Sequence, residues 1–326
     1  MNWKVKILTN PEYPNPLIMN RADPWIYKHS DGKYYFTATS PEYDRIELRV
    51  SDTLAGLEDA IPKIIWSSHA NGAMSRLTWA PEIHYSFGKW HVYFAASHTG
   101  ELHKKHNTFQ HRMYVIEADE PLRGQWREAG QIETDMDTFS LDATVFESKG
   151  KTYYVWAQKD PAIAGNSNIY IAEMTNASTL ALPATLLTKP EYPWECSVIP
   201  VNEGPAVISH EGRIFLTYSA NATGPEYCIG LLTANEKDNL CDASCWQKST
   251  KPVFMTSEEN HKYGPGHNGF TCSEDGSTLL LVYHVREYLS IEGNPLDNPD
   301  RNTCVQPIYF NDHGDLTLGI PNKKNR

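Results

Sequence analysis

Residues 202–220 read NEGPAVISHEGRIFLTYSA, two apolar runs separated by the polar turn His210-Glu211-Gly212. A Glu-Gly turn between runs rich in Ile, Val, Phe and Tyr is typical of a β-hairpin. The same layout of apolar run, glycine turn and apolar run occurs in five segments of the chain, PWIYKHSDGKYYFTAT, EIHYSFGKWHVYFAAS, ATVFESKGKTYYVWAQ, AVISHEGRIFLTYSA and FTCSEDGSTLLLVYHV. The chain therefore contains an internal repeat.

The turn glycines of these segments are spaced almost evenly along the chain. They are Gly32, Gly88, Gly150, Gly212 and Gly276, so the gaps between them are 56, 62, 62 and 64 residues. Five unrelated hairpins in a generic β protein would not keep such regular gaps. Shorter strand-and-turn segments such as RVSDTLAGL and IGLLTANEKDNL follow the hairpins, so each unit is expected to hold about four strands. The repeat predicts an all-β fold, a single five-bladed β-propeller spanning residues 1–326.

Composition and charge restrict the classes of partner. The chain has 326 residues, 40% of them hydrophobic, and a formal net charge of −11, which opposes binding to nucleic acid or to an anionic membrane. No stretch approaches the roughly 20 apolar residues of a membrane span. The first residues, MNWKVKILTNPEYPNP, lack the apolar core of a signal peptide, so a cytoplasmic location is expected. A neutral or cationic small molecule is the expected partner, and the oligomeric state is left open.

An ionisable residue stands near the start of each predicted hairpin. Counted back from the turn glycine, the positions are Asp23 (9 residues), Glu82 (6), Asp142 (8), Glu203 (9) and His267 (9). Strands often begin with a polar residue, which would explain one such position. If the first strand of each hairpin is the innermost of its blade, however, all five side chains surround the axis at one end. Carboxyls packed there repel one another, which separates their pKa values and gives one acid and one base. We therefore expect the active site in a central funnel.

Residues that follow the turns return to the same end of the strands, because the strands of a hairpin are antiparallel. This places Glu42, His98, Asp160, Asn221 and Arg286 near the rim of the funnel. Arg286 carries a fixed charge on a planar donor fork and is a candidate to bind substrate, although a surface ion pair would explain it equally well.

Tryptophans lie close in sequence to the acids, at positions 25, 79 and 194. An aromatic ring beside hydrogen-bonding acids suits a sugar, which has apolar C–H faces and a rim of hydroxyls. Trp79 is the predicted substrate-binding residue of this group. His267 could support a metal ion whose remaining ligands are waters, and a hydrogen-bonded structural histidine is the alternative.

Six motifs occur in a characteristic order: RADPW, WAPE at 79–82, LDATVF around Asp142, NEGP at 202–205, GPGHN at 264–268 and VREYLSIEGNPLDNPDRNTCVQ near the C-terminus. With them the sequence resembles glycoside hydrolase family 43 over nearly its whole length. The resemblance implies a five-bladed propeller and an inverting glycosidase acting on arabinose- or xylose-containing oligosaccharides. WAPE departs from the pattern, because many relatives have Asp where this chain has Glu82, so Glu82 is left out of the catalytic set.

The resemblance also implies roles for individual residues. Asp23 would be the general base, Glu203 the general acid, and Asp142 the group that raises the pKa of the acid and orients it. His267 would support a calcium or other ion on the propeller axis, held mostly through waters, and Arg286 would contact substrate. No organic cofactor is implied.

GPGHN and the C-terminal motif resemble those of α-L-arabinofuranosidases more than those of β-xylosidases. The expected function is therefore inverting release of terminal α-L-arabinofuranosyl residues from arabino-oligosaccharides. The apparent lack of a signal peptide favours an exo-acting enzyme on short imported substrates. A β-xylosidase or an endo-arabinanase of the same family, and a non-catalytic carbohydrate-binding propeller, remain as alternatives.

Overall fold

The five predicted hairpins are present, and their turns have the backbone conformation that the sequence suggests. The computed structural model describes residues 13–323. The five turn glycines have φ between 73° and 83°, a left-handed conformation that costs glycine little because it has no Cβ. On either side of each turn, aromatic and β-branched residues continue into two antiparallel strands.

These hairpins begin five sheets, here called blades I to V, whose strands follow chain order from the inner to the outer edge. Blade I contains β1 (Ala22–Lys28), β2 (Tyr34–Thr39), β3 (Arg45–Ser51) and β4 (Lys63–Ser67). Blade II contains β5 (Arg76–Ser86), β6 (Lys89–Ser97), β7 (Arg112–Ala118) and β8 (Arg127–Gln131). Blade III contains β9 (Ser140–Ser148), β10 (Lys151–Gln158) and β11 (Asn168–Asn176), with β12 (Thr179–Leu180) and β13 (Thr185–Thr188) both paired to β11.

Blade IV contains β14 (Asn202–His210), β15 (Arg213–Ala220), β16 (Cys228–Asn235) and β17 (Gln247–Lys248). Blade V contains β18 (Tyr263–Cys272), β19 (Leu279–Arg286) and β20 (Asn302–Pro307), and a small hairpin of β21 (Tyr309–Phe310) and β22 (Leu316–Thr317) follows it. The helical segments of the described residues are three short 3₁₀ turns, η1 (Ala55–Leu57), η2 (Pro193–Glu195) and η3 (Ala243–Cys245).

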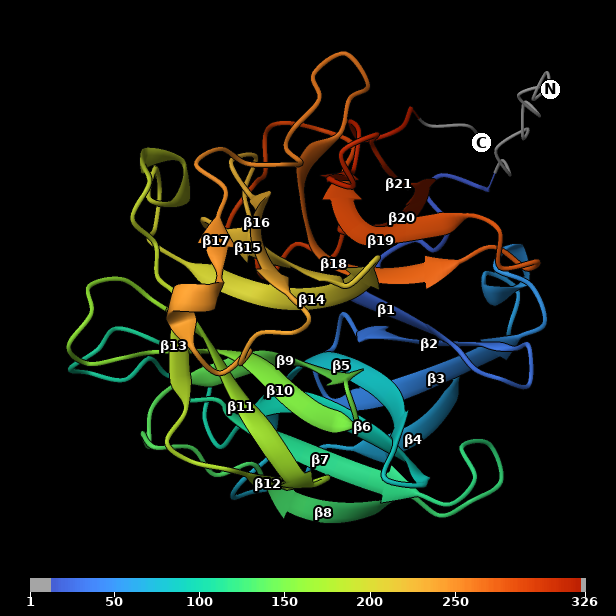
Figure 1. The fold of residues 1–326 in the computed structure, drawn as a ribbon. Coiled ribbons are helices and arrows are strands. Elements are labelled where there is room, and N and C mark those ends of the chain that lie inside the picture. The colour runs from blue at the N-terminus through green and yellow to red at the C-terminus, as the bar shows by residue number, and fades with distance from the viewer. Residues whose placement is uncertain (1–12, 324–326) are drawn as a thin grey trace, which may run out of the picture.

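The inner strands β1, β5, β9, β14 and β18 contact one another in a closed ring (Figure 1). This arrangement confirms the predicted all-β, five-bladed propeller. Apolar side chains fill the space between neighbouring blades. Trp25, for example, belongs to a core cluster that joins blades I and II, where its Nε1 donates to the backbone oxygen of Ile83 at 2.8 Å. The predicted domain of residues 1–326 includes two ends, 1–12 and 324–326, that lie outside the described residues.

Blade V is completed by a segment from the beginning of the chain. Ile18 forms an antiparallel bridge with Thr303 of β20, in which the Thr303 nitrogen donates to the Ile18 oxygen at 2.9 Å. The Leu17 nitrogen donates to the Thr303 oxygen at 2.8 Å. The first and last blades are thus joined by main-chain hydrogen bonds, and the outer edge of β20 is covered. Over residues 13–323 no helix is both long and apolar enough to cross a membrane.

Candidate active site

Each inner strand contains an irregularity near its first residues. There the pairing register shifts, and a left-handed residue recurs in every blade: Asp23, Ala80, Asp142, Gly204 and His267, with φ between 43° and 53°. β5 and β18 each contain a second such residue, Leu77 and Gly264. Such bulges re-aim side chains and occur next to active sites. Non-glycine residues rarely adopt this conformation, so its recurrence marks a position where the surrounding fold holds strain.

The bulges show which positions of the five blades are equivalent. Asp23, Asp142 and His267 occupy the bulge itself, whereas Glu203 precedes it by one residue and Glu82 follows it by two. Counting from the turn glycines therefore identified the correct end of each strand but not the correct register. The misplacement matters most for Glu82, which does not line the cavity described below and instead lies buried 3.0 Å from Nε2 of His84.

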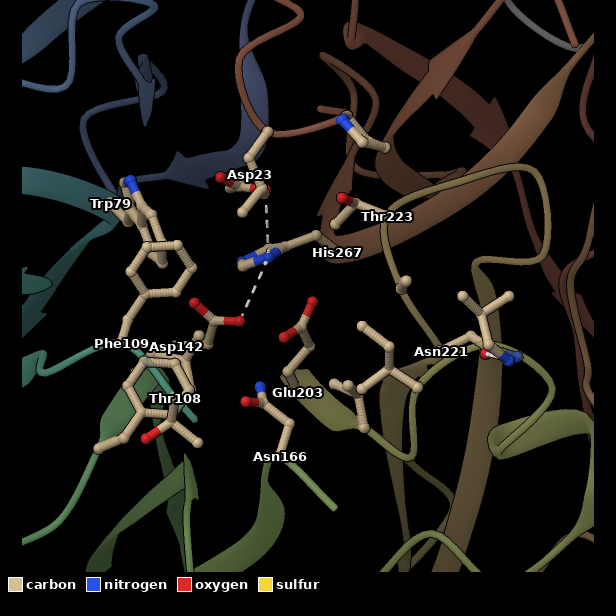
Figure 2. Close-up of a pocket in the computed structure, with 18 of the residues that line it drawn as sticks. Asp23, Trp79, Thr108, Phe109, Asp142, Asn166, Glu203, Asn221, Thr223 and His267 are labelled. Atoms are coloured by element: carbon tan, nitrogen blue, oxygen red, sulfur yellow. Dashed lines mark hydrogen bonds and ion pairs between the residues drawn. The ribbon is translucent and has the colours of Figure 1, made fainter. Parts of the chain in front are cut away.

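A cavity of about 590 Å³ opens at this end of the propeller. Asp23, Asp142, Glu203, His267 and Trp79 all line it, as shown in Figure 2. Loops around residues 102–109, 198–201, 221–223 and 294–296 form much of its wall, to which Phe139, Leu141, Asn166 and Arg301 also contribute. Its volume is in the range of small-molecule sites, so the predicted central pocket is present and can hold a small ligand.

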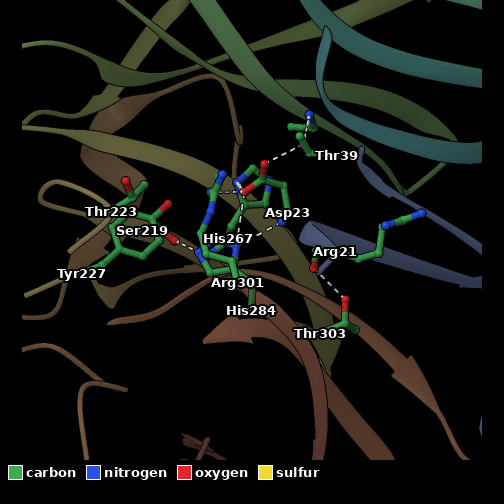
Figure 3. Close-up of polar contacts among 12 residues, drawn as sticks. Arg21, Asp23, Thr39, Ser219, Thr223, Tyr227, His267, His284, Arg301 and Thr303 are labelled. Atoms are coloured by element: carbon green, nitrogen blue, oxygen red, sulfur yellow. Dashed lines mark hydrogen bonds and ion pairs between the residues drawn. The ribbon is translucent and has the colours of Figure 1, made fainter. Parts of the chain in front are cut away.

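Asp23 is surrounded by groups that stabilise its charge (Figure 3). Nη1 of the buried Arg301 lies 3.1 Å from Oδ1, Nδ1 of His267 lies 3.3 Å from the same oxygen, and the Thr39 hydroxyl donates to Oδ2 at 2.6 Å. Burial raises the pKa of Asp23, but the charge of Arg301, with His267 and His284, outweighs it and holds this pKa well below 3.8. Asp23 is therefore a buried anion that can accept a proton.

The pKa values of Glu203 and Asp142 are raised, in contrast to that of Asp23. Burial raises the pKa of Glu203 to about 7, although its carboxylate accepts a 2.7 Å hydrogen bond from the Tyr227 hydroxyl, which lowers it. Burial and the charge of Glu203 raise the pKa of Asp142 well above 3.8. Asp142 accepts a hydrogen bond from the Gly204 nitrogen at 3.1 Å, so it is tied to the residue that follows Glu203. The pair holds a proton at neutral pH, mainly because both groups are buried.

The cavity thus contains an ionised carboxylate on blade I and, on blades III and IV, a pair of carboxyls that holds a proton at neutral pH. Two carboxyls whose environments drive their pKa values apart can serve as base and acid in one reaction. Glu203 is well suited to the acid role, since a donor works best when its pKa is close to the working pH.

Trp79 forms an aromatic wall of the cavity. Its ring stacks on His111, with centroids 3.9 Å apart and an interplanar angle of 25°, and Phe109 meets it edge-on at 4.9 Å. These contacts fix the orientation of the indole, so it can offer a flat apolar surface to a ligand. Trp25 and Trp194 do not line the cavity; the first is core, and Nε1 of the second donates to the Thr250 oxygen.

Arg286 lies outside the cavity lining, which corrects the expectation that it contacts substrate. It is 3% exposed, and its guanidinium donates to backbone oxygens of Thr223 at 2.8 Å and Pro295 at 2.6 Å. Nε also donates to the Asn298 side chain at 3.3 Å. Arg286 therefore holds together two loops of the cavity wall, and its donors are used within the protein.

The other rim predictions have mixed outcomes, and some functional residues were missed. Of the four remaining positions only Asn221 lines the cavity, whereas Glu42, His98 and Asp160 do not. Arg301 and Tyr227, the partners of Asp23 and Glu203, were not identified from the sequence. A buried ionised carboxylate requires a partner, but the sequence has no pattern that selects Arg301 among its arginines.

The residues around His267 do not by themselves build a calcium site. Nδ1 of His267 faces the carboxylates of Asp23 and Asp142 at 3.3 and 3.6 Å, so only its second nitrogen could reach an ion. Calcium takes six to eight oxygen ligands, and within residues 13–323 no three His, Cys, Asp or Glu side chains converge as a metal-binding group. We assign no catalytic step to a metal.

Known proteins resemble this chain closely. It is 50% identical over 311 residues to an extracellular exo-α-(1→5)-L-arabinofuranosidase of Streptomyces avermitilis. The matched region covers 95% of this chain but only 63% of that protein. It is 49% identical to an enzyme of the same name from Streptomyces chartreusis, covering 87% and 85% of the two chains. The crystal structure of an α-L-arabinofuranosidase from Lactobacillus brevis superposes with a TM-score of 0.95 at 56% identity, covering 96% of this chain and 98% of that one.

These relatives contradict the expected cytoplasmic location, because both Streptomyces proteins are named as extracellular. The expectation was wrong in its premise. It rested on the composition of the first residues of the sequence, and the names of the relatives overturn it.

The family assignment agrees with the fold and with the cavity. The sequence profile described as glycosyl hydrolases family 43 matches residues 13–315, nearly all of the described propeller. This chain belongs to glycosyl hydrolases family 43.

Proposed function

We propose that this protein is an inverting glycoside hydrolase that releases terminal α-L-arabinofuranosyl residues from arabino-oligosaccharides. The observation that carries the proposal is that Asp23 and Glu203 line one cavity in opposite environments, which hold the pKa of Asp23 well below 3.8 and raise that of Glu203 to about 7. The names of the relatives, arabinofuranosidases at 49–56% identity, support the choice of sugar.

In the proposed reaction Glu203 donates its proton to the glycosidic oxygen as the bond from that oxygen to the anomeric carbon breaks. Asp23 takes a proton from a water that attacks the opposite face of the sugar, so the anomeric configuration inverts. Asp23 ends protonated and Glu203 ionised, and solvent restores both. Asp142 orients Glu203 through its bond to the Gly204 nitrogen and, by sharing the buried site, disfavours a second charge there.

Two aryl glycosides test the substrate. We expect kcat/KM for p-nitrophenyl α-L-arabinofuranoside to exceed that for p-nitrophenyl β-D-xylopyranoside by about 100-fold. Proton NMR of the first turnovers should show β-arabinofuranose, the inverted product. The reverse preference would identify a β-xylosidase, oligosaccharides released from arabinan an endo-enzyme, and binding without hydrolysis a non-catalytic propeller.

The pH profile depends on the Tyr227 hydrogen bond. Because Glu203 acts only while protonated, kcat/KM should fall as pH rises through about 7. The Tyr227 hydroxyl lowers the pKa of Glu203, so Tyr227→Phe should move this falling limb to higher pH. Tyr309→Phe, at an exposed position on β21, is the control and should leave the profile unchanged. A limb that stays in place or moves to lower pH in Tyr227→Phe would contradict the role of this bond.

A calcium ion near His267, held mostly through waters, stays a prediction from the family resemblance. Metal analysis of the protein after gel filtration in metal-free buffer should find about one calcium per chain, and His267→Ala should remove it. A wild-type protein that retains no ion, but keeps its melting temperature in the presence of a chelator, would refute this prediction.

A further inference from the structure

The loop that leads into β14 forms the cavity wall on the side of the proposed acid. Val198 and Ile199 belong to this loop and line the cavity with 54% and 48% of their surface exposed. Figure 2 shows Glu203 and Asn221 on the side of the cavity away from Trp79. Two aliphatic side chains of the cavity lining are therefore exposed to solvent, in the loop that leads to the strand of the proposed acid, where a bound ligand would remove them from water.

Asn221 fixes this loop from one side. It is 1% exposed, and its Oδ1 accepts a hydrogen bond from the Val198 nitrogen at 2.9 Å. Its Nδ2 donates to the Trp194 oxygen at 2.6 Å and to the Ser197 hydroxyl at 2.8 Å. Both amide hydrogens are thus used within the protein. Asn221 lines the cavity but serves to hold the loop, and it has no donor left for a sugar hydroxyl.

Glu195 fixes the same loop from the other side. Its carboxylate is fully buried and accepts hydrogen bonds from the Tyr218 hydroxyl at 2.9 Å, from Nζ of Lys248 at 2.9 Å and from Nδ2 of Asn202 at 3.0 Å. Asn202 directly precedes Glu203 in the chain. One buried anchor therefore fixes both the loop and the strand end that carries the acid, so their relative positions are set together.

The acid defines which part of the substrate this loop meets. Glu203 must reach the glycosidic oxygen, so the leaving group lies on its side of the cavity. The buried cation of the site, Arg301, lies at Asp23 together with the imidazole of His267. On the side of Glu203 the ligand meets aliphatic surface, with the amide of Asn166 as an additional polar group of the lining.

We propose that Val198 and Ile199, here called the apolar shelf, recognise the leaving group of the substrate through its nonpolar face. The site then prefers α-L-arabinofuranosides whose leaving group presents a flat apolar surface, such as an aromatic ring or the C–H face of a second sugar. A small alkyl leaving group gains little from the shelf. This inference rests on the proposed function and adds its leaving-group specificity.

Hydrolysis-resistant thioglycosides test the shelf without interference from leaving-group chemistry. The inhibition constants of phenyl and methyl 1-thio-α-L-arabinofuranoside are measured on wild type and on Val198→Thr/Ile199→Thr. Threonine keeps the branched shape at Cβ, so the loop is preserved. A hydroxyl replaces a methyl group in Val198→Thr and an ethyl group in Ile199→Thr. We expect the constant for the phenyl compound to rise about fivefold or more, since each buried methylene contributes roughly a factor of four. The constant for the methyl compound should change less than twofold.

Ile61→Thr is the matched control, because Ile61 is 90% exposed and lies between η1 and β4, outside the cavity lining. It should alter neither constant. If the double variant does not fold, Ile199→Thr alone should still weaken the phenyl compound selectively by at least twofold. Equal weakening of both compounds, or of neither, would overturn the shelf. A wild-type protein that hydrolyses no arabinofuranoside would refute the proposed function instead.

Discussion

Glu203→Gln is expected to lower kcat on arabinobiose by about 10³-fold, because glutamine cannot give a proton to the departing sugar hydroxyl. The loss should be much smaller on 2,4-dinitrophenyl α-L-arabinofuranoside, since that phenolate leaves without protonation. Steady-state kinetics on both substrates provides the measurement. A loss of the same size on both, or none on arabinobiose, would exclude Glu203 as the acid.

The fold of this variant should be intact, and its stability has a predictable sign. Burial raises the pKa of Glu203 from 4.5 to about 7, so the stability that this group contributes is present below pH 4.5 and is lost as pH rises through 7. Glutamine does not ionise, so at pH 8 the variant should melt at or above the wild-type temperature. Glu211→Gln, exposed at the turn of the same hairpin, is the matched control and should retain wild-type turnover.

Asp23→Asn is expected to lower kcat by about 10⁴-fold on both substrates alike, because activation of water does not depend on the leaving group. Sodium azide should restore turnover on the dinitrophenyl substrate, since this anion attacks the sugar without a base, and the product should be the β-arabinofuranosyl azide. A variant whose loss depends on the leaving group, as expected for Glu203→Gln, would show that the two roles are exchanged.

Unlike Glu203→Gln, the Asp23→Asn variant should be less stable than wild type. Asp23 neutralises Arg301, whose side chain is 6% exposed, and a buried cation without its counter-ion costs about 3–5 kcal/mol. Thermal melting should therefore show a clear decrease for Asp23→Asn and little change for Asp52→Asn, where the aspartate side chain is 81% exposed. Activity must be assayed below the melting temperature, so that loss of turnover is separated from unfolding.

The sequence predicted the architecture because the fold is encoded locally. Each blade begins with a hairpin whose turn chemistry lies within a few residues, and even spacing of these turns is visible in one chain. The register of the site is different, since it depends on bulges that shift the pairing at Asp23, Asp142 and His267. Counting from a glycine cannot detect an extra residue in a strand, which is why Glu82 seemed equivalent to the acids.

The hydrogen-bond partners of Asp23 and Glu203 could not be predicted from the sequence for another reason. Arg301 is 278 residues from Asp23, and Tyr227 lies 24 residues after Glu203, directly before β16 of the same blade. Such pairings follow from the three-dimensional arrangement of blades and leave no local pattern. For Arg286 the sequence position suggested contact with substrate, but in the structure its guanidinium donates hydrogen bonds to the backbone of two loops of the cavity wall.

The pairing of Ile18 with Thr303 links the proposed base to the closure of the propeller ring. Asp23 and Arg301 stand on opposite sides of this seam, each within a few residues of the bond that seals it. Until the two ends of the polypeptide meet, the base lacks the cation that keeps it charged. A propeller in which this bridge is open is therefore expected to lack activity, so that turnover reports closure of the ring.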